Sequence, residues 1–263
     1  MESSDVTYSF ACVCNTNYIE NTVVCLESFF EHNSIPVDVY MVNSEKTNAF
    51  DRFDLVRVHY TYYAIDRRLY TFTCYRKCLE EIAFRFAIMD QMTTDYLVIF
   101  DTDTLFVDSI DDVLLEYPTT LNVVKNRFFD GINAGFIIYK RNPKKLFDRF
   151  MKDIIEGVRY DLLEEEFMYK IFKDDITFLD SRFNYCEWMV PTESKPAMIH
   201  YVGPFKPFKM FDKLIPGTFT TKYFDMYYEF VDKHKDIVSE DFKRTLKSTK
   251  RFSKLINKVK ERD

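Results

Sequence analysis

Apolar and polar positions along the first hundred residues form stretches of two kinds. Stretches that are apolar at every second position, or apolar throughout, predict strands. Stretches with apolar residues three and four positions apart predict amphipathic helices, and YRKCLEEIAFRFAIMDQM shows this spacing most strongly. The predicted strands span residues 6–14, 36–42, 54–60 and 95–100, and the predicted helices span residues 17–32 and 75–92.

The second half of the chain continues this alternation. Strands are predicted over residues 120–126 and 131–141, helices over 143–157 and 162–172, a strand running into a loop over 197–208, and helices over much of 223–260. Such an order predicts a mostly parallel α/β sheet whose ligand site lies beyond the carboxyl ends of its strands. Because no Gly/Ser-rich or Pro-rich linker interrupts it, we expect one main domain over residues 1–232, followed by a helical tail over 233–263.

The charge of the chain is unevenly distributed. From Lys233 onward there are 11 Lys and Arg against 5 Asp and Glu, whereas residues 1–232 hold 25 against 37. An acidic body argues against a nucleic-acid partner. The basic tail places Phe252, Leu255, Ile256 and Val259 on one helical face, which suits either peripheral contact with an acidic membrane surface or packing on the protein itself.

The cysteines and the chain start indicate the compartment. Six dispersed cysteines form no pair of CxxC units for a zinc site, which favours free thiols in a reducing environment. Residues 1–10 lack the basic and apolar regions of a secretory signal, and no run of about 18 apolar residues occurs. We therefore expect a soluble, cytoplasmic protein without a membrane span.

Two aspartates follow the apolar strand YLVIF directly. If the chain stays extended, Asp101 and Asp103 point the same way, about 6.6 Å apart. Two carboxylates this close repel one another unless a cation lies between them. A divalent metal site is one interpretation, and a solvated turn at the strand end is the other.

Two enzyme classes carry a DxD pair after a strand. In haloacid-dehalogenase phosphatases the pair supplies a nucleophile and an acid/base, but Thr104 and Leu105 stand where that motif expects Gly and then Thr or Val. Its strand is also normally the first of the fold, whereas here several elements precede it. In nucleotide-sugar glycosyltransferases the pair holds a metal on a diphosphate.

The segment HYVGPFKPF offers further groups for a metal diphosphate. His200 would serve as a third metal ligand, Gly203 would let the backbone approach closely, and Lys206 would neutralise phosphate. A histidine alone is commonly structural. Together with Asp101 and Asp103, the combination favours the glycosyltransferase.

Three motifs resemble glycosyltransferase family 8, which includes glycogenin, galactinol synthase and lipooligosaccharide galactosyltransferases. VIFDTDTLFVDSIDDVL is similar to the family's DxD segment, INAGF to its FN(S/A)G segment and HYVGPFKP to its HxxGxxKPW. The resemblance spans about residues 6–208. It implies a GT-A (Rossmann-like) fold and retaining transfer of a hexose, glucose or galactose, from a UDP-sugar. It also implies Mn²⁺, or Mg²⁺, held by Asp101, Asp103 and His200.

The resemblance also assigns residues to the donor. The strand end and helix start correspond to the family's uracil site, and a basic residue in the helix before the DxD segment corresponds to a donor contact. Thr102, within the DxD segment, and the INAGF turn complete this group. The donor-binding residues so predicted are Cys12, Cys14, Asn15, Tyr18, Arg85, Thr102, Ala134, Gly135, Gly203 and Lys206.

The sugar end departs from the family pattern. Asn133 and the preceding Asp130 match sugar-binding positions, but EEEFMY places Glu164 and Glu165 where the family shows Asp and Gln. Glu164 is the residue to test as a nucleophile, and these four residues are the catalytic candidates. A haloacid-dehalogenase-type phosphatase and a catalytically degenerate UDP-sugar binder remain as alternatives. The acceptor, whether glycan, protein or lipid-linked sugar, stays open, as does the oligomeric state, with a homodimer as one option.

Overall fold

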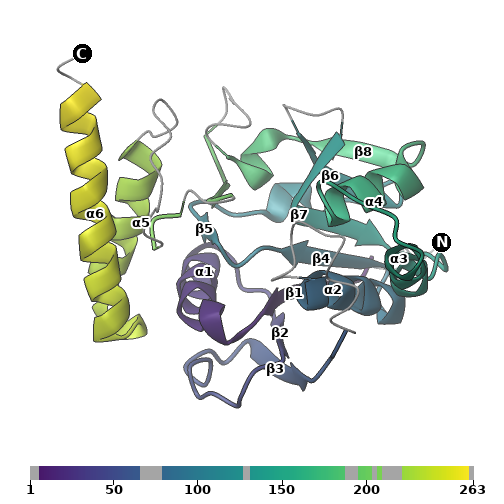
Figure 1. Cartoon of the computed structure of the whole chain (residues 1–263), viewed down its shortest axis with the longest axis horizontal. Helices are drawn as coiled ribbons and strands as arrows, with labels where there is room; N and C mark the ends of the chain where they lie inside the picture. The colour runs from purple at the N-terminus through teal and green to yellow at the C-terminus, as the bar shows by residue number, and fades with distance from the viewer. Residues whose placement is uncertain are drawn as a thin grey trace.

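A computed structural model describes residues 6–65, 79–126, 131–186, 195–202, 206–208 and 221–260, with side chains except at residues 221 and 252–260. Seven strands form one sheet in the order β3-β2-β1-β4-β7-β6-β8, flanked by helices (Figure 1). The strands of this sheet are β1 (Tyr8–Cys14), β2 (Val37–Val42), β3 (Val56–Thr61), β4 (Tyr96–Phe100), β6 (Leu121–Asn126), β7 (Gly131–Lys140) and β8 (Ile176–Leu179). The α-helices are α1 (Ile19–His32), α2 (Leu79–Gln91), α3 (Leu146–Ile155), α4 (Glu164–Phe172), α5 (Thr221–Lys233) and α6 (Glu240–Lys260).

The pairing of the strands confirms the mostly parallel α/β sheet. β1, β2, β3 and β4 pair in parallel, and so do β6 and β8. β7 runs antiparallel to both of its neighbours, β4 and β6. Because β1 and β4 are parallel neighbours in the middle of the sheet, their carboxyl ends open onto the same edge, where a ligand site is expected.

The central strand β4 is buried on both faces, and its alternate side chains enter two separate cores. One core contains Tyr96, Val98 and Phe100 together with Phe29 of α1 and residues of α5 and α6. Leu97 and Ile99 pack in the core formed with α2, α3 and α4. A continuous apolar sequence is what a strand covered on both faces requires.

Two short strands, β5 and β8, were not predicted, and a third, β9, was predicted as a strand but without its partner. β5 (Thr104–Phe106) follows the DxD segment directly and pairs antiparallel with β9 (Met198–His200) in a second sheet. β8 adds an edge strand to the main sheet. The pairing of β5 with β9 matters for function because it places Thr104 opposite His200, almost a hundred residues later in the chain.

The C-terminal helices lie side by side at one end of the molecule (Figure 1). Phe242 and Leu246 of α6 are buried in the core, and Thr249 donates a hydrogen bond to the Pro207 carbonyl oxygen at 2.6 Å. The side chains of Phe252, Leu255, Ile256 and Val259, for which two interpretations were open, lie outside the described residues.

No helix of the described part has the length and apolarity that crossing a bilayer requires. The described cysteines, Cys12, Cys14, Cys25 and Cys186, are all buried, and the first three are free thiols.

Candidate functional site

The DxD segment bends instead of staying extended. Strand β4 ends at Phe100, and β5 begins at Thr104, with bends at Thr102 and Asp103 between them. Thr104 Oγ1 donates to the Asp101 carbonyl oxygen at 2.8 Å, which closes this turn. The expected extended geometry is therefore wrong, yet the two carboxylates still converge, because the turn brings both to His200.

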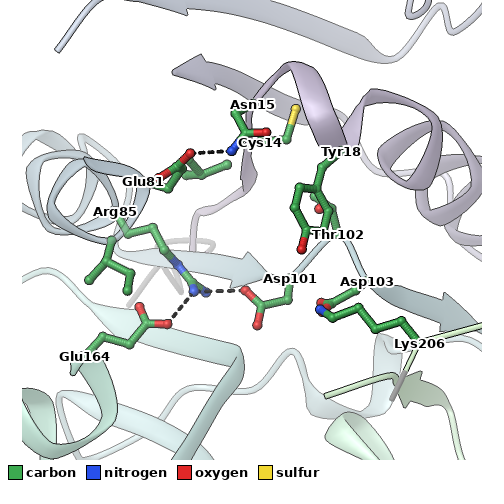
Figure 2. Close-up of a pocket in the computed structure, with 12 residues that line it drawn as sticks. Cys14, Asn15, Tyr18, Glu81, Arg85, Asp101, Thr102, Asp103, Glu164 and Lys206 are labelled. Atoms are coloured by element: carbon green, nitrogen blue, oxygen red, sulfur yellow. Dashed lines mark hydrogen bonds and ion pairs between the residues drawn. The ribbon is translucent and has the colours of Figure 1, made fainter. Parts of the chain in front are cut away.

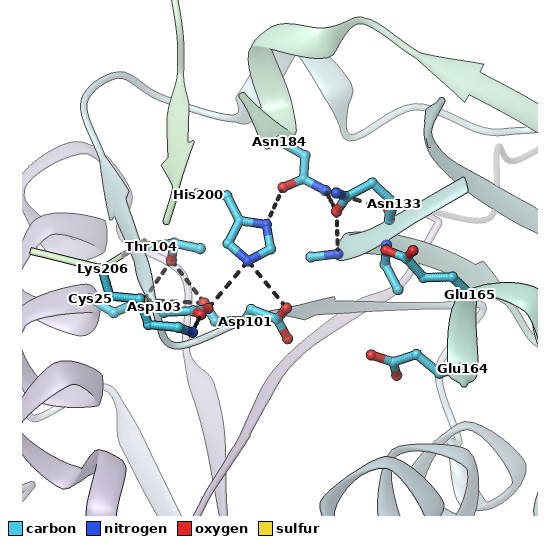
Figure 3. A network of polar contacts seen from close by, with 12 residues as sticks. Cys25, Asp101, Asp103, Thr104, Asn133, Glu164, Glu165, Asn184, His200 and Lys206 are labelled. Carbon is cyan, nitrogen blue, oxygen red and sulfur yellow. Dashed lines mark hydrogen bonds and ion pairs between the residues drawn. The ribbon is translucent and has the colours of Figure 1, made fainter. Parts of the chain in front are cut away.

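Asp101, Asp103 and His200 form a cluster that can hold one cation (Figure 3). His200 Nε2 lies 3.4 Å from Asp101 Oδ2 and 3.2 Å from Asp103 Oδ1, and the three candidate ligand atoms all lie within 4.8 Å of one another. Two carboxylate oxygens and an imidazole nitrogen suit Mn²⁺, and the oxygens also suit Mg²⁺. These residues come from the ends of β4 and β9, so the two sheets build the site together.

A close contact between backbone and imidazole explains the glycine of INAGF. A Cβ added at Gly135 would lie 2.2 Å from two atoms of the His200 ring. No side chain fits there without displacing the imidazole. Gly135 therefore makes room for His200, and its predicted contact with the donor stays a prediction.

Lys206 lies beside the cluster and is paired with Asp103. Burial alone would raise the pKa of Asp103, but the Lys206 ammonium and His200 together hold that pKa well below its ordinary value. Lys206 Nζ also lies 5.6 Å from the centre of the Tyr18 ring. An ammonium at this point adds positive charge next to the proposed metal position, as the sequence predicts.

Arg85 is buried, and both of its terminal nitrogens contact protein oxygens (Figure 2). Its Nη1 lies 2.9 Å from Asp101 Oδ1 and 2.9 Å from Glu164 Oε1, and its Nη2 donates to the Ala134 carbonyl oxygen at 3.0 Å. The sequence places Arg85 correctly at the site. Its observed contacts hold Asp101, α4 and β7 together.

Glu164 and Glu165 begin helix α4 and lie on the side of Asp101 opposite Lys206 (Figure 3). Burial raises the pKa of Glu165 to about 7, and Glu165 Oε1 accepts a hydrogen bond from the Ala134 backbone at 3.0 Å. Burial also raises the pKa of Glu164, against the opposing effect of Arg85. Leu163, just before them, has φ 44° and ψ −108°, a strained backbone that aims the first turn of α4 at the site.

A cavity of about 240 Å³ extends from the cluster to the end of β1 (Figure 2). Asn15 lines it, but both ends of its carboxamide are engaged: Oδ1 accepts from the Asn17 backbone at 2.9 Å, and Nδ2 donates to Glu81. Cys12, predicted to contact the donor, is fully buried in the core and does not line this cavity. The described residues that line the cavity are Val13, Cys14, Asn15, Tyr18, Glu81, Ile82, Arg85, Asp101, Thr102, Asp103, Glu164 and Lys206.

Two of the predicted residues, Asp130 and Gly203, lie outside the described residues. The sequence analysis missed two residues that the structure places at the site, Glu81 and Asn184. Glu81 lies four positions before Arg85 on the same helix, a spacing that could have indicated a shared face. Asn184, which contacts His200, follows no motif and could be found only from the fold.

Comparisons with known proteins identify the class of fold. No family model and no curated protein matches the sequence. Among solved structures, the galactosyltransferase LgtC in complex with donor and acceptor sugar analogues matches with a TM-score of 0.70 at 16% identity, over 90% of this chain and 100% of LgtC. The glycosyltransferase GlyE of Streptococcus pneumoniae TIGR4 matches with a TM-score of 0.64 at 14% identity, over 96% of this chain and 64% of GlyE.

A third structure, mouse xyloside xylosyltransferase 1, matches with a TM-score of 0.52 at 12% identity, over 73% of this chain and 97% of its own. All three similar structures are glycosyltransferases. The chain therefore has the GT-A glycosyltransferase fold, which confirms the fold that the three motifs implied.

Proposed function

We propose that this protein is a metal-dependent glycosyltransferase that moves a hexose, glucose or galactose, from a UDP-sugar to an acceptor hydroxyl. The observation that carries the proposal is the convergence of Asp101, Asp103 and His200 beside Lys206, at the mouth of a cavity beyond the carboxyl ends of β1 and β4. The complex of LgtC with donor and acceptor sugar analogues supports a two-substrate reaction on this fold.

The cluster and its neighbours divide the labour of such a reaction. Asp101, Asp103 and His200 would hold Mn²⁺, or Mg²⁺, which when bound neutralises charge on the leaving diphosphate. Lys206, whose ammonium lies against Asp103 beside the cluster, would add a second positive charge near that diphosphate. The nucleoside would occupy the end of the cavity near Cys14, Asn15 and Tyr18.

The sugar would lie toward the opposite end, near α4 and the start of β7. Asn133, Glu164 and Glu165 stand there, and Glu164 is paired with Arg85. A carboxylate held by a guanidinium is a poor nucleophile, so we favour front-face attack, with retention, in which the departing phosphate takes the acceptor proton. An active-site mutant of LgtC carries a glutamine-to-glutamate exchange, and the family resemblance places Glu165 at a glutamine position.

The fold favours the glycosyltransferase over the phosphatase, since the similar structures above are glycosyltransferases. A degenerate UDP-sugar binder is the second candidate, because the Glu164–Arg85 pair and the extra charge of Glu165 alter the sugar end. The two candidates bind the same donor and differ in turnover alone. The acceptor, a glycan, a protein or a lipid-linked sugar, would enter from the sugar side.

A screen of UDP-sugars with Mn²⁺, with products identified by mass spectrometry, tests the proposal. We expect release of free sugar or transfer from UDP-glucose or UDP-galactose, and UDP binding that requires the metal. Asp103→Asn should weaken metal-dependent UDP binding at least 100-fold. Asp108→Asn, on the same segment but exposed to solvent, should leave it within twofold.

Wild-type protein that binds UDP but releases no sugar from any donor would favour the degenerate binder. Absence of UDP binding, or equal binding by the Asp103→Asn protein, would contradict the proposed site altogether. Phosphate release from small phosphomonoesters would favour the phosphatase.

A further inference from the structure

Asn184 lies behind the metal cluster, at the end of the 3-10 turn η4 (Ser181–Asn184), and its side chain is fully buried. Its Oδ1 lies 2.8 Å from His200 Nδ1, and its Nδ2 lies 2.6 Å from Asn133 Oδ1 (Figure 3). Asn184 therefore touches both a metal-ligand candidate and a sugar-side candidate, although it does not line the cavity itself.

The hydrogen-bond network fixes the direction of these contacts. Asn133 Oδ1 also accepts from the Gly135 backbone at 3.0 Å, so this atom is an oxygen and must receive the donor Nδ2 of Asn184. The remaining atom of Asn184, its Oδ1, can only accept. His200 Nδ1 must then carry a hydrogen, so in the neutral imidazole that a metal ligand requires, the lone pair is on Nε2, on the side of Asp101 and Asp103.

The backbone holds this network in register. Tyr185, next to Asn184, donates its N–H to the Met198 carbonyl oxygen at 2.9 Å, and His200 donates its N–H to the Tyr185 carbonyl oxygen at 2.8 Å. The Asn184 carboxamide also closes the space around Gly135, where an added Cβ would lie 2.8 Å from Asn184 Oδ1. Asn184 and His200 therefore cannot shift independently.

We propose that Asn184 is a positioning residue that keeps His200 as an Nε2 metal ligand and at the same time fixes the Asn133 side chain of β7 on the sugar side. This inference rests on the proposed metal site. One carboxamide joins the metal half of the site to the sugar half, through its acceptor on one side and its donor on the other. Loss of such an outer partner typically weakens metal binding 10- to 100-fold.

The two halves of the proposal can be separated by two substitutions. Asn184→Leu removes both hydrogen bonds at similar volume. Asn184→Asp keeps an acceptor for His200 Nδ1–H but loses the donor to Asn133. Asn122→Leu serves as the control, because Asn122 is an equally buried asparagine, on β6, that bonds to Thr119 and Ile138 instead.

The test measures Mn²⁺ affinity by electron paramagnetic resonance and histidine coordination by the ¹⁴N modulation in pulsed spectra of the Mn²⁺-loaded protein. We expect Asn184→Leu to lose about tenfold or more in affinity, together with the imidazole ¹⁴N signal. Asn184→Asp should keep both, yet lose affinity for UDP-glucose and UDP-galactose relative to UDP. Asn122→Leu should keep the wild-type signal and both ligand affinities.

An Asn184→Leu protein with wild-type affinity and ¹⁴N signal would overturn the positioning of His200. If that variant does not fold, as judged by circular dichroism, the Asn184→Asp protein decides: loss of its ¹⁴N signal, or unchanged preference between UDP-sugar and UDP, overturns the proposal. Wild-type protein that shows the ¹⁴N signal but transfers no sugar would contradict the proposed function and leave this comparison intact.

Discussion

At the residue scale, the environment of the Glu81 carboxylate suggests a contact with the nucleoside of the donor. Glu81 lines the cavity, its Oε1 accepts from Asn15, and its buried Oε2 has no hydrogen-bond partner among the described residues. A buried acceptor without a partner costs stability unless a ligand supplies a donor. The hydroxyl and N–H groups of a nucleoside are donors of the required kind.

We therefore expect Glu81→Gln to weaken UDP binding about tenfold, or ~1.4 kcal/mol, because an amide cannot accept at both of its ends. Titration calorimetry with UDP in the presence of Mn²⁺ measures the effect. Glu31→Gln, on the far end of α1 beside Lys233, is the control and should leave the affinity unchanged. Equal affinities for wild-type and Glu81→Gln protein would remove Glu81 from the donor site.

At this scale, residues with fixed spacing could be predicted and residues brought in by tertiary structure could not. Asp101, Asp103, His200 and Lys206 were found because each belongs to a motif, and the structure brings them together. Arg85 was found at the site, but its pairing with Glu164 depends on where α4 begins. Asn184 carries no local signal, because its partners lie 51 and 16 positions away.

Helix α4 shows how one element places charge at the site. Its first turn holds Glu164, Glu165 and Glu166, and the positive end of the helix dipole favours carboxylates there. Burial nevertheless dominates at Glu165 and raises its pKa to about 7. The folded protein thus binds this proton more tightly than the unfolded chain does, so stability falls as pH rises from about 4.5 to about 7.

Glu165→Gln should therefore stabilise the metal-free protein more at pH 8 than at pH 5, by roughly 3 kcal/mol at most, or several degrees in Tm. Glutamine keeps the acceptor for the Ala134 N–H and removes the ionisable group. Differential scanning calorimetry in EDTA at the two pH values gives the comparison, with the pH 5 value as the internal control. A gain of equal size at both pH values would show that ionisation of Glu165 does not cost stability.

At the scale of the elements, long helices and strands could be predicted from the sequence more reliably than short ones. Strong amphipathic or continuous apolar patterns identified α1, α2 and β4 within a few residues. β5 has three residues and β8 has four, too few for a period to emerge, whereas the three-residue β9 was predicted as the strand that opens residues 197–208. The antiparallel β7 was predicted as a strand, but its direction is set by its pairing with β4 rather than by its own sequence.

Residues 1–232 are acidic overall and residues 233–263 are basic, and α6, which holds most of these basic residues, lies at one end of the molecule (Figure 1). A cavity of about 340 Å³ between α5 and α6 is lined by Lys235, Lys243, Lys247 and Lys250, together with Asp232 and Glu240. Phe242 and Leu246 pack inward, so α6 holds its basic residues on a helix anchored to the body. The division at residue 232 and the membrane contact of the tail stay predictions.

Contact with an acidic membrane can be tested without removing α6, whose buried residues support the core. Each lysine near an anionic surface contributes about 1 kcal/mol. Replacing the exposed Lys235 and Lys247 together by glutamine should therefore reduce sedimentation with phosphatidylglycerol vesicles by roughly tenfold or more. Neutral phosphatidylcholine vesicles should not bind either protein.

The control replaces two exposed lysines of the body, Lys152 and Lys173, by glutamine. Equal loss of binding in both double variants would show that net charge alone determines vesicle binding. No loss in either variant would contradict a membrane contact through Lys235 and α6.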